Sequence, residues 1–278
     1  MDDAEEKRAA EILSPETRLA NAWQPFTPLG VAAFARGPFW KVMVLELFVA
    51  AISAAVVIWF FHTNYSPSIL EAIQNLPDEA ALQSGGLTNV SSQVLTEKKF
   101  LSVAIDLEES GELGKVADLQ VELRQNYFQI CSLVGCLMFD YPKENIALGR
   151  STSEPWWGAR QPVVFGMIGA ATFIGVWLSW SILALVYAPI AKLIAYLANR
   201  ELSWSGSWKL ACASQMFAAL LMSLAILLYG LQAFDLIRFL FFFSAHFVVA
   251  WIFVCASPFS LPRITEKISA TKNPFDSK

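Results

Sequence analysis

Residues 42–61 read VMVLELFVAAISAAVVIWFF, and Glu46 is the one charged residue among them. A hydrocarbon layer about 30 Å thick requires roughly 20 apolar residues at a rise of 1.5 Å each. The stretch therefore has the length and composition of a membrane-spanning helix. A secretory signal peptide is the alternative, but its apolar core is about 7–15 residues long and lies near the start of the chain. No small-residue cleavage site follows Phe61, which favours a retained span.

Three more stretches, at 162–187, 210–231 and 239–256, contain no Asp, Glu, Lys or Arg. A charged side chain at the centre of a spanning helix costs about 2.5–3.5 kcal/mol on insertion scales, so this absence is typical of spans. The whole chain is 16% charged, against roughly a quarter in soluble domains. Helices in a soluble core seldom stay apolar on every face for this long. The sequence predicts four spans.

Lys and Arg flank the spans unevenly, and such an excess marks the cytoplasmic side. They precede the first span, lie between the second and third, and follow the fourth, whereas only Arg238 separates the third from the fourth. Both termini are therefore expected in the cytoplasm, with the spans in the cell inner (plasma) membrane. The expected segments are a cytoplasmic N-terminal segment with an interfacial helix at 1–38, spans at 39–61, 162–188, 210–231 and 239–256, an extracytoplasmic domain at 62–161, a cytoplasmic loop at 189–209, a short external loop at 232–238 and a cytoplasmic tail at 257–278.

Tryptophans bracket the predicted spans, and such rings favour the headgroup layer. The anchors are Trp40, Trp59, Trp156, Trp157, Trp204 and Trp208; stacking on a ligand is their alternative use. Before the first span, Ser14 with Pro15 and Thr27 with Pro28 each form a helix-start signal. The segment after Thr27 is expected to lie along the membrane interface as an entry elbow, or else to dock a cytoplasmic partner.

Residues 62–161 are too long for a simple connection and hold 13 acidic against 7 basic residues. Residues 66–77 predict a short helix capped by Ser66 with Pro67 in its first turn. The next residues predict two short strands about Gly85 and Gly86, and FLSVAID and the stretch around QIC look strand-like. The fold class expected is a four-span helical membrane bundle with a small α+β extracytoplasmic domain between spans 1 and 2.

Cys131 and Cys136 stand in QICSLVGCLMF. If Ser132–Gly135 form a hairpin loop, the two sulfurs face each other, and a disulfide is plausible in an oxidising space. Two buried free thiols are the alternative. A metal site is disfavoured because it would want four nitrogen or sulfur ligands, and His62 is the only histidine in this region.

The sequence offers no catalytic, cofactor-binding or metal-binding constellation. It contains two histidines and no phosphate loop, HExxH or GxSxG. Nucleic acid is disfavoured as a partner because the net charge is −4 and no basic stripe is present.

Polar residues inside the spans are the remaining candidates. Glu46 lies about 6 Å inside the first span at 1.5 Å per residue, where a carboxylate serves either structure or an ion or proton pathway. His246 is expected to hydrogen-bond between helices, with Gln215 or a serine as its partner. Gly166 and Ala170 have the small-xxx-small spacing that suits close helix packing.

The order of parts resembles the bacterial membrane proteins sometimes labelled maltodextrin-utilisation proteins, which are relatives of the Yip (Ypt-interacting protein) family. The resemblance rests on ILEAIQNLPDEAALQSGGLTN, after the first span, and on AKLIAYLANRELSWSGSWKLACASQMFAALL, a polar turn and re-entry between late spans. It implies a helical membrane bundle without known enzyme activity and supplies no catalytic residues.

Three functions remain open from the sequence. The first is a non-enzymatic scaffold or sensor/binding subunit that uses the external domain, with the lipid bilayer and a protein partner or second copy as its contacts. The second is a small transporter or accessory subunit, in which Glu46 or His246 lines a path. A membrane enzyme ranks last, for lack of candidate groups.

Overall fold

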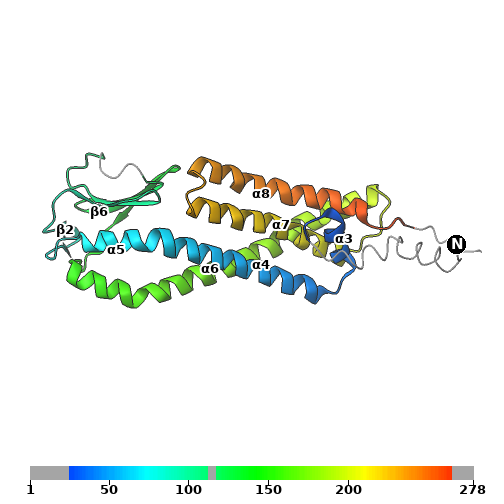
Figure 1. The fold of residues 1–278 in the computed structure, drawn as a ribbon, viewed down its shortest axis with the longest axis horizontal. Helices are drawn as coiled ribbons and strands as arrows, with labels where there is room; N and C mark the ends of the chain where they lie inside the picture. The colour runs from blue at the N-terminus through cyan, green and yellow to red at the C-terminus, as the bar shows by residue number, and fades with distance from the viewer. Residues whose placement is uncertain (1–24, 112–116, 265–278) are drawn as a thin grey trace, which may run out of the picture. The chain divides into compact units, whose positions relative to one another are not determined.

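The computed structural model describes residues 25–111 and 117–264, so the predicted helix start at Ser14 and Pro15 lies outside the described residues. Within these residues, four helices are long and apolar enough to cross a membrane, as the sequence predicts. They cover Phe39–Gln74, Arg150–Leu197, Trp204–Gly230 and Leu236–Ser260. Figure 1 shows them with the strands that lie between the first two in the chain.

The first long helix consists of three consecutive segments, α4 (Phe39–Phe60), the π-helical turn η1 (Phe61–Tyr65) and α5 (Ser66–Gln74). The predicted cap at Ser66 is therefore wrong. Ser66 has helical backbone angles, φ −59° and ψ −43°, and the residues before it are already helical. A side-chain cap is needed only where a helix begins from non-helical chain.

The second long helix, α6 (Arg150–Leu197), starts twelve residues ahead of Pro162 and also continues beyond the predicted end. Hydropathy marks only the part of a helix that lies in lipid, whereas the hydrogen-bond ladder can continue into water. An ion pair of 3.4 Å between Arg150 and Glu154 supports its first turn. Its 48 residues would measure roughly 72 Å at 1.5 Å each, more than twice the hydrocarbon thickness.

The loop after α6 is correspondingly shorter than the predicted 189–209. Only residues 198–203 separate α6 from α7 (Trp204–Gly230), and α8 (Leu236–Ala256) follows after 231–235 and ends in the 3₁₀ turn η2 (Ser257–Ser260). Apolar side chains recur on the exposed side of α6 about every four residues, at Val163, Met167, Ile174, Leu178, Ile182 and Leu185. An exposed apolar stripe of this length is suited to contact with lipid rather than water.

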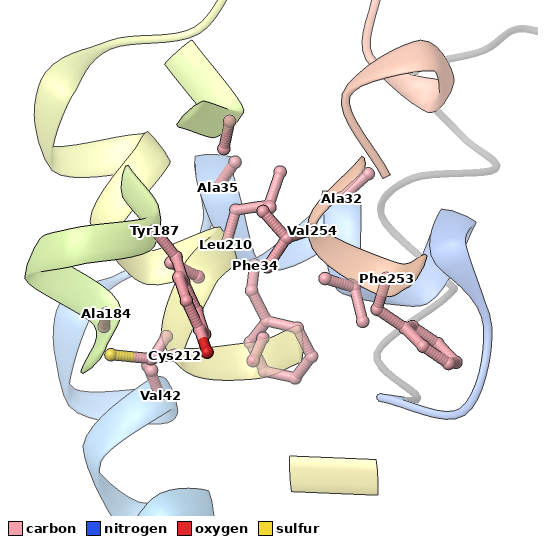
Figure 2. Packing of buried hydrophobic residues seen from close by; sticks show 14 of the residues in the cluster. Ala32, Phe34, Ala35, Val42, Ala184, Tyr187, Leu210, Cys212, Phe253 and Val254 are labelled. Carbon is pink, nitrogen blue, oxygen red and sulfur yellow. The ribbon is translucent and has the colours of Figure 1, made fainter. Parts of the chain in front are cut away.

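The described residues form two compact units. The first unit consists of residues 25–52, 173–222 and 241–264, and the second of residues 53–111, 117–172 and 223–240. The core of the first unit is built from helix segments of α4, α6, α7 and α8 around the short helix α3 (Pro28–Arg36). Figure 2 shows Phe34 and Ala35 of α3 among Leu210 of α7 and Val254 of α8.

α3 corrects the prediction of an interfacial helix. Six consecutive residues, Gly30–Ala35, are buried, so no face of the helix is left for a membrane surface. A helix that is apolar all round belongs in a core, and the small residues of VAAFA allow neighbours to approach. The predicted helix start is confirmed, because Thr27 Oγ1 accepts a 3.1 Å hydrogen bond from Gly30 N.

Polar contacts fasten the end of α3 to α7 and to the loop before it. Arg36 pairs with Glu201 at 3.3 Å, and Lys209 Nζ donates to the carbonyl oxygen of Gly37 at 2.7 Å. Residues Ala35, Arg36, Glu201, Leu202, Ser203 and Lys209 line a cavity of about 460 Å³ there. Both cations already hold partners, so these contacts are best explained as anchoring α3.

The second unit contains two sheets. Five strands pair in the order β3-β4-β5-β6-β7: β3 (Gln93–Glu97), β4 (Leu101–Ile105), β5 (Leu119–Leu123), β6 (Tyr127–Ser132) and β7 (Gly135–Asp140). Three short strands pair in the order β2-β1-β8: β1 (Ala81–Gln83), β2 (Gly86–Thr88) and β8 (Ile146–Ala147). A buried cluster of Ala72, Leu82, Leu87, Leu95, Ile105 and Tyr141 joins α5 to the strands.

The two predicted turns in this region have different outcomes. The strands about Gly85 and Gly86 are present, and Ser84 and Gly85 both have positive φ, as a type I′ hairpin requires. The turn between β6 and β7 contains two residues, Leu133 and Val134, rather than the predicted four, because Ser132 pairs with Gly135.

Candidate functional site

The main candidate site lies where strands β4 and β5 begin. β4 and β5 are parallel, with Leu101 opposite Leu119. The residues just before the two strands therefore lie next to each other, at the same end of both strands. Asp118 N donates to Lys99 O at 2.9 Å and holds these two residues side by side. The carboxylate of Asp118 and the ammonium group of Lys99 therefore start from the same end of these two strands.

Two hydrogen bonds join Asp118 and Lys99 to the residues at and just after the end of α7, in the same unit. The hydroxyl of Tyr229, near the end of α7, donates to Asp118 Oδ2 at 2.6 Å. Lys99 Nζ donates to the carbonyl oxygen of Phe234, in the loop between α7 and α8, at 2.9 Å. Charge-assisted bonds of this kind are among the stronger hydrogen bonds in proteins.

Aromatic rings surround Tyr229. Its ring stacks on Phe239 at 4.7 Å and on Phe60 at 5.6 Å, and it meets the edge of Phe100 at 4.9 Å. Lys99 Nζ lies 5.4 Å from the ring centroid of Phe100 and 5.8 Å from that of Tyr229, within the range of a cation–π interaction. The rings hold the two charged groups in an otherwise apolar setting.

A groove opens at this place. Two cavities, of about 350 and 270 Å³, share Asp118 and Leu236 in their walls, and we call them together the Asp118 groove. The larger is also lined by Val57, Phe60, Tyr65, Leu119, Ile226, Tyr229 and Phe239, and the smaller by Ala117, Gln120, Cys131, Ser132 and Leu133. The described residues of its walls are mostly apolar, and Asp118 is the one carboxylate among them, which suits an amphiphilic ligand.

Sequence reasoning missed Lys99, Asp118 and Tyr229. Tyr229 and Asp118 are 111 positions apart, and no motif connects them. The signal that was available is the position of Tyr229 at the end of a predicted span, where an amphipathic ring has its hydroxyl near polar groups.

β7 is a second feature of the same unit. It forms one edge of the five-stranded sheet, and all six of its residues are exposed, including Leu137, Met138 and Phe139. The structure joins Cys131 of β6 and Cys136 of β7 in a disulfide. The hairpin tip beyond it consists of Leu133 and Val134, both exposed.

The five-stranded sheet also holds buried charged side chains. Arg124 NH2 lies 2.8 Å from Glu122 Oε2 and 3.9 Å from Asp106 Oδ2, and Gln129 donates to the same Glu122 oxygen at 2.5 Å. Burial by itself raises the pKa of Asp106. Hydrogen bonds from Gly111 and Ser110 and the positive charge of Arg124 lower it by more, so the pKa lies below its usual value. Arg124 Nε has no hydrogen-bond partner among the described residues, but the ion pairs of Arg124 with Glu122 and Asp106 favour a structural role for the cluster in the sheet.

Glu46 is fully buried on α4, on the same side as Val42, Val49 and Ala50. Neither of its carboxylate oxygens has a hydrogen-bond partner among the described residues. A buried polar group without a partner costs free energy, so the structure keeps Glu46 as a candidate intramembrane site.

His246 and Gln215 do not form the predicted interhelical hydrogen bond. His246 Nδ1 contacts the carbonyl oxygen of Phe243 in its own helix. Gln215 instead donates to Trp180 O at 3.1 Å and to Ala211 O at 3.3 Å. Each side chain finds a backbone carbonyl closer than the other side chain, so the two are not brought together.

The predicted close packing at Gly166 and Ala170 is also displaced. Both residues are exposed, whereas Gly169 is buried, and a methyl group there would lie 2.5 Å from Ile58 Cδ1. The face of α6 that contacts α4 therefore contains Gly169, and the small-xxx-small pair Gly166 and Ala170 lies on another face.

The predicted tryptophan anchors have different surroundings. Trp40, Trp156 and Trp204 are exposed, as membrane-facing rings should be, whereas Trp157 is buried. Trp59 and Trp208 are partly buried, and Trp208 stacks on Phe39 at 5.5 Å. Arg160 lies over the ring of Trp156 at 4.7 Å, an arrangement that suits the headgroup layer.

Among the described residues no group of three or more His, Cys, Asp or Glu side chains is placed to hold a metal ion. A scan against protein-family models found no match for this chain, and neither did searches of curated proteins and of solved structures. The function is therefore argued from the geometry, and the resemblance to Yip-related proteins stays a prediction.

Proposed function

We propose that this protein is a non-enzymatic integral membrane subunit that holds a partner protein through the domain between its first two spans. The observation that supports this most directly is the exposed apolar edge strand β7. An edge strand presents unpaired N–H and C=O groups to any extended chain that reaches it. The partner proposed is an extended segment of another protein that adds to β7 as a further strand.

The two edges of the sheet differ in a way that favours β7. Edge strands are commonly protected by bulges, lysines or prolines. The β3 edge has a register shift between Val94 and Thr96, whereas β7 pairs with β6 without interruption and contains no lysine or proline. The disulfide at Cys131 and Cys136 holds the hairpin that presents this edge. β7 therefore has the features of a pairing edge and β3 does not.

Charge favours a different protein over a second copy. Residues 62–161 hold 13 acidic against 7 basic side chains, so two copies approaching through β7 would bring like charges together. A basic partner would instead be attracted to this surface. The Lys and Arg distribution supports a proposed topology with this domain on the outer side of the membrane and both termini in the cytoplasm. The resemblance to Yip-related proteins and the lack of a cleavage site after the first span favour a bacterial inner membrane.

The test is site-specific crosslinking in intact cells, with a photoreactive residue in place of Met138 on β7 or, as the control, Val94 on β3. We expect an adduct from position 138 that contains an extended, basic segment of another protein, and none from position 94. Changing Leu137 to Lys in the position-138 protein should abolish the adduct. Adducts of equal yield from both edges, or an adduct with a second copy of this chain, would rule the proposed partner out.

Transport is the second candidate, and the buried, unpartnered carboxylate of Glu46 favours it. In this case Glu46→Gln abolishes flux of an ion or proton in reconstituted vesicles while the amount of folded protein is unchanged. Glu201→Gln, which alters an exposed carboxylate in the same unit, serves as the matched control. A silent Glu46→Gln leaves the partner-binding function as the better account.

A further inference from the structure

We propose that the Asp118 groove binds a membrane phospholipid whose headgroup carries a primary amine. The lipid's ammonium group binds Asp118, its phosphate faces Lys99, and an acyl chain lies against the apolar wall formed by Phe60, Ile226 and Phe239. This inference does not depend on the partner proposed for β7.

The position of the groove is the first argument. Its walls include the ends of two helices that are long enough to cross a membrane, since Tyr229 is next to the last residue of α7 and Leu236 begins α8. Phe60 adds the point at which α4 passes into η1, where the predicted first span ends. The ends of spanning helices lie at the headgroup layer. A lipid can therefore enter this groove without leaving the depth at which its headgroup already lies.

The charges are the second argument. Tyr229 occupies Asp118 Oδ2 with one hydrogen bond, and an ionised carboxylate has about four acceptor sites. Lys99 has three donors, of which one goes to Phe234 O. Asp118 is part of the groove wall, whereas Lys99 lies next to the groove, with its Nζ 5.8 Å from the ring centroid of Tyr229. An anion in the wall and a cation beside it suit a zwitterionic headgroup.

The type of headgroup follows from the hydrogen-bonding capacity of Asp118. A primary ammonium group donates N–H bonds to a carboxylate, whereas a quaternary ammonium group has no N–H to donate. A glycerol headgroup brings no positive charge and would leave Asp118 beside a phosphate. Phosphatidylethanolamine is therefore expected to bind better than phosphatidylcholine or phosphatidylglycerol of the same chains.

The volume is the third argument. The two cavities, of about 350 and 270 Å³, share Asp118 and Leu236, and sites for small amphiphiles commonly measure about 300–1,000 Å³. The larger cavity has the apolar walls that suit a chain, and Asp118 lies where the two meet. The two cavities have room for the headgroup at Asp118 and the first part of one chain, so the rest of the lipid would stay in the bilayer.

The test uses the full-length protein, delipidated in detergent and titrated with phosphatidylethanolamine, phosphatidylcholine or phosphatidylglycerol of identical chains, with native mass spectrometry to count bound lipids. We expect wild type to bind phosphatidylethanolamine most tightly. Asp118→Asn should weaken that binding about tenfold, since a charge-assisted hydrogen bond is lost. Glu144→Gln alters an exposed carboxylate of the same unit that lies outside both the groove and β7 and should leave binding unchanged.

Leu236→Trp is the second variant, because it fills both cavities without altering the bond between Tyr229 and Asp118. It should reduce phosphatidylethanolamine binding while circular dichroism shows the helical content of the wild type. Equal affinity for the three lipids overturns the proposal. So does wild-type binding of phosphatidylethanolamine by both Asp118→Asn and Leu236→Trp.

Discussion

A methyl group on Gly206 of α7 would lie 3.0 Å from the carbonyl oxygen of Ala35, near the end of α3. It would also lie 2.9 Å from the hydroxyl oxygen of Ser203, which accepts a hydrogen bond from Gly206 N at 2.9 Å. The first turn of α7 thus approaches α3 as closely as a residue without a side chain allows. This close approach is one of the contacts that pack α3 into the core of the first unit.

Gly206→Ala is therefore expected to destabilise the protein, although alanine is normally the better helix residue by about 1 kcal/mol. The added methyl group must displace backbone of α3, and overpacking of this kind costs about 1–3 kcal/mol. Thermal unfolding in detergent measures the change. On α6, a new methyl group at Gly158 would meet no atom of the described residues within 4 Å beyond its own turns of helix. Gly158→Ala should therefore be neutral or stabilising, and equal effects at the two sites would contradict the close approach.

Tyr229→Phe should lower stability, because it removes the hydrogen bond to Asp118 and keeps the stacked ring. A hydrogen bond to a charged group contributes about 1.5–3 kcal/mol. The midpoint of thermal unfolding reports the loss. Tyr196→Phe removes the hydroxyl from a tyrosine that is 75% exposed and should leave the midpoint unchanged.

Arg124→Ala should be among the most damaging substitutions in the sheet. It leaves the buried carboxylates of Glu122 and Asp106 without their cation, and breaking a buried pair in this way costs about 3–5 kcal/mol. Arg150→Ala breaks an exposed pair with Glu154 and should cost at most about 1 kcal/mol. Chemical denaturation of the two variants compares the costs directly; similar losses would mean that the Arg124 cluster is hydrated.

The pH dependence of stability should reflect Asp106, whose pKa is lowered in the folded protein. A carboxyl group with a lowered pKa stabilises the fold above its unfolded value, about 3.9, and the contribution is lost as the pH falls through the lower folded value. Unfolding midpoints should therefore decline below about pH 4. Asp106→Asn should flatten this decline, whereas Asp140→Asn, at an exposed position, should retain it.

Replacing Cys131 and Cys136 together by alanine should destabilise the β6–β7 hairpin. The disulfide closes a loop with a sequence separation of 5, for which the chain-entropy model gives about 2 kcal/mol. Reductant should lower the thermal midpoint of the wild type towards that of the double variant and leave the variant unchanged. A wild type insensitive to reductant in the unfolding assay would indicate that the two thiols are free.

Much of the helical part of this fold could be predicted from the sequence. Long runs with at most one charged residue locate the four spans, because a charge inside lipid is costly. The ends of those helices could not be predicted as well. α6 continues for twelve residues before its apolar run, since a helix outside lipid is decided by local hydrogen bonds and pairs such as Arg150 with Glu154.

The candidate site was less predictable than the spans. Glu46 stands out in the sequence because it is a charge inside an apolar run, and the structure buries it without a partner among the described residues. Lys99, Asp118 and Tyr229 are ordinary residues of a polar segment and of a span end. Their meeting depends on the parallel register of β4 and β5 and on the place where α7 ends.

The sequence by itself determined that four long apolar helices form, because their composition leaves lipid as the favourable surroundings for them. Only the tertiary structure decided that α3 is buried rather than interfacial, since nine residues of mixed small and apolar type suit either place. It also decided that a carboxylate, an ammonium group and an aromatic hydroxyl share one groove. Contacts between residues far apart in the chain depend on how the elements pack, and the hydropathy of the sequence does not predict that packing.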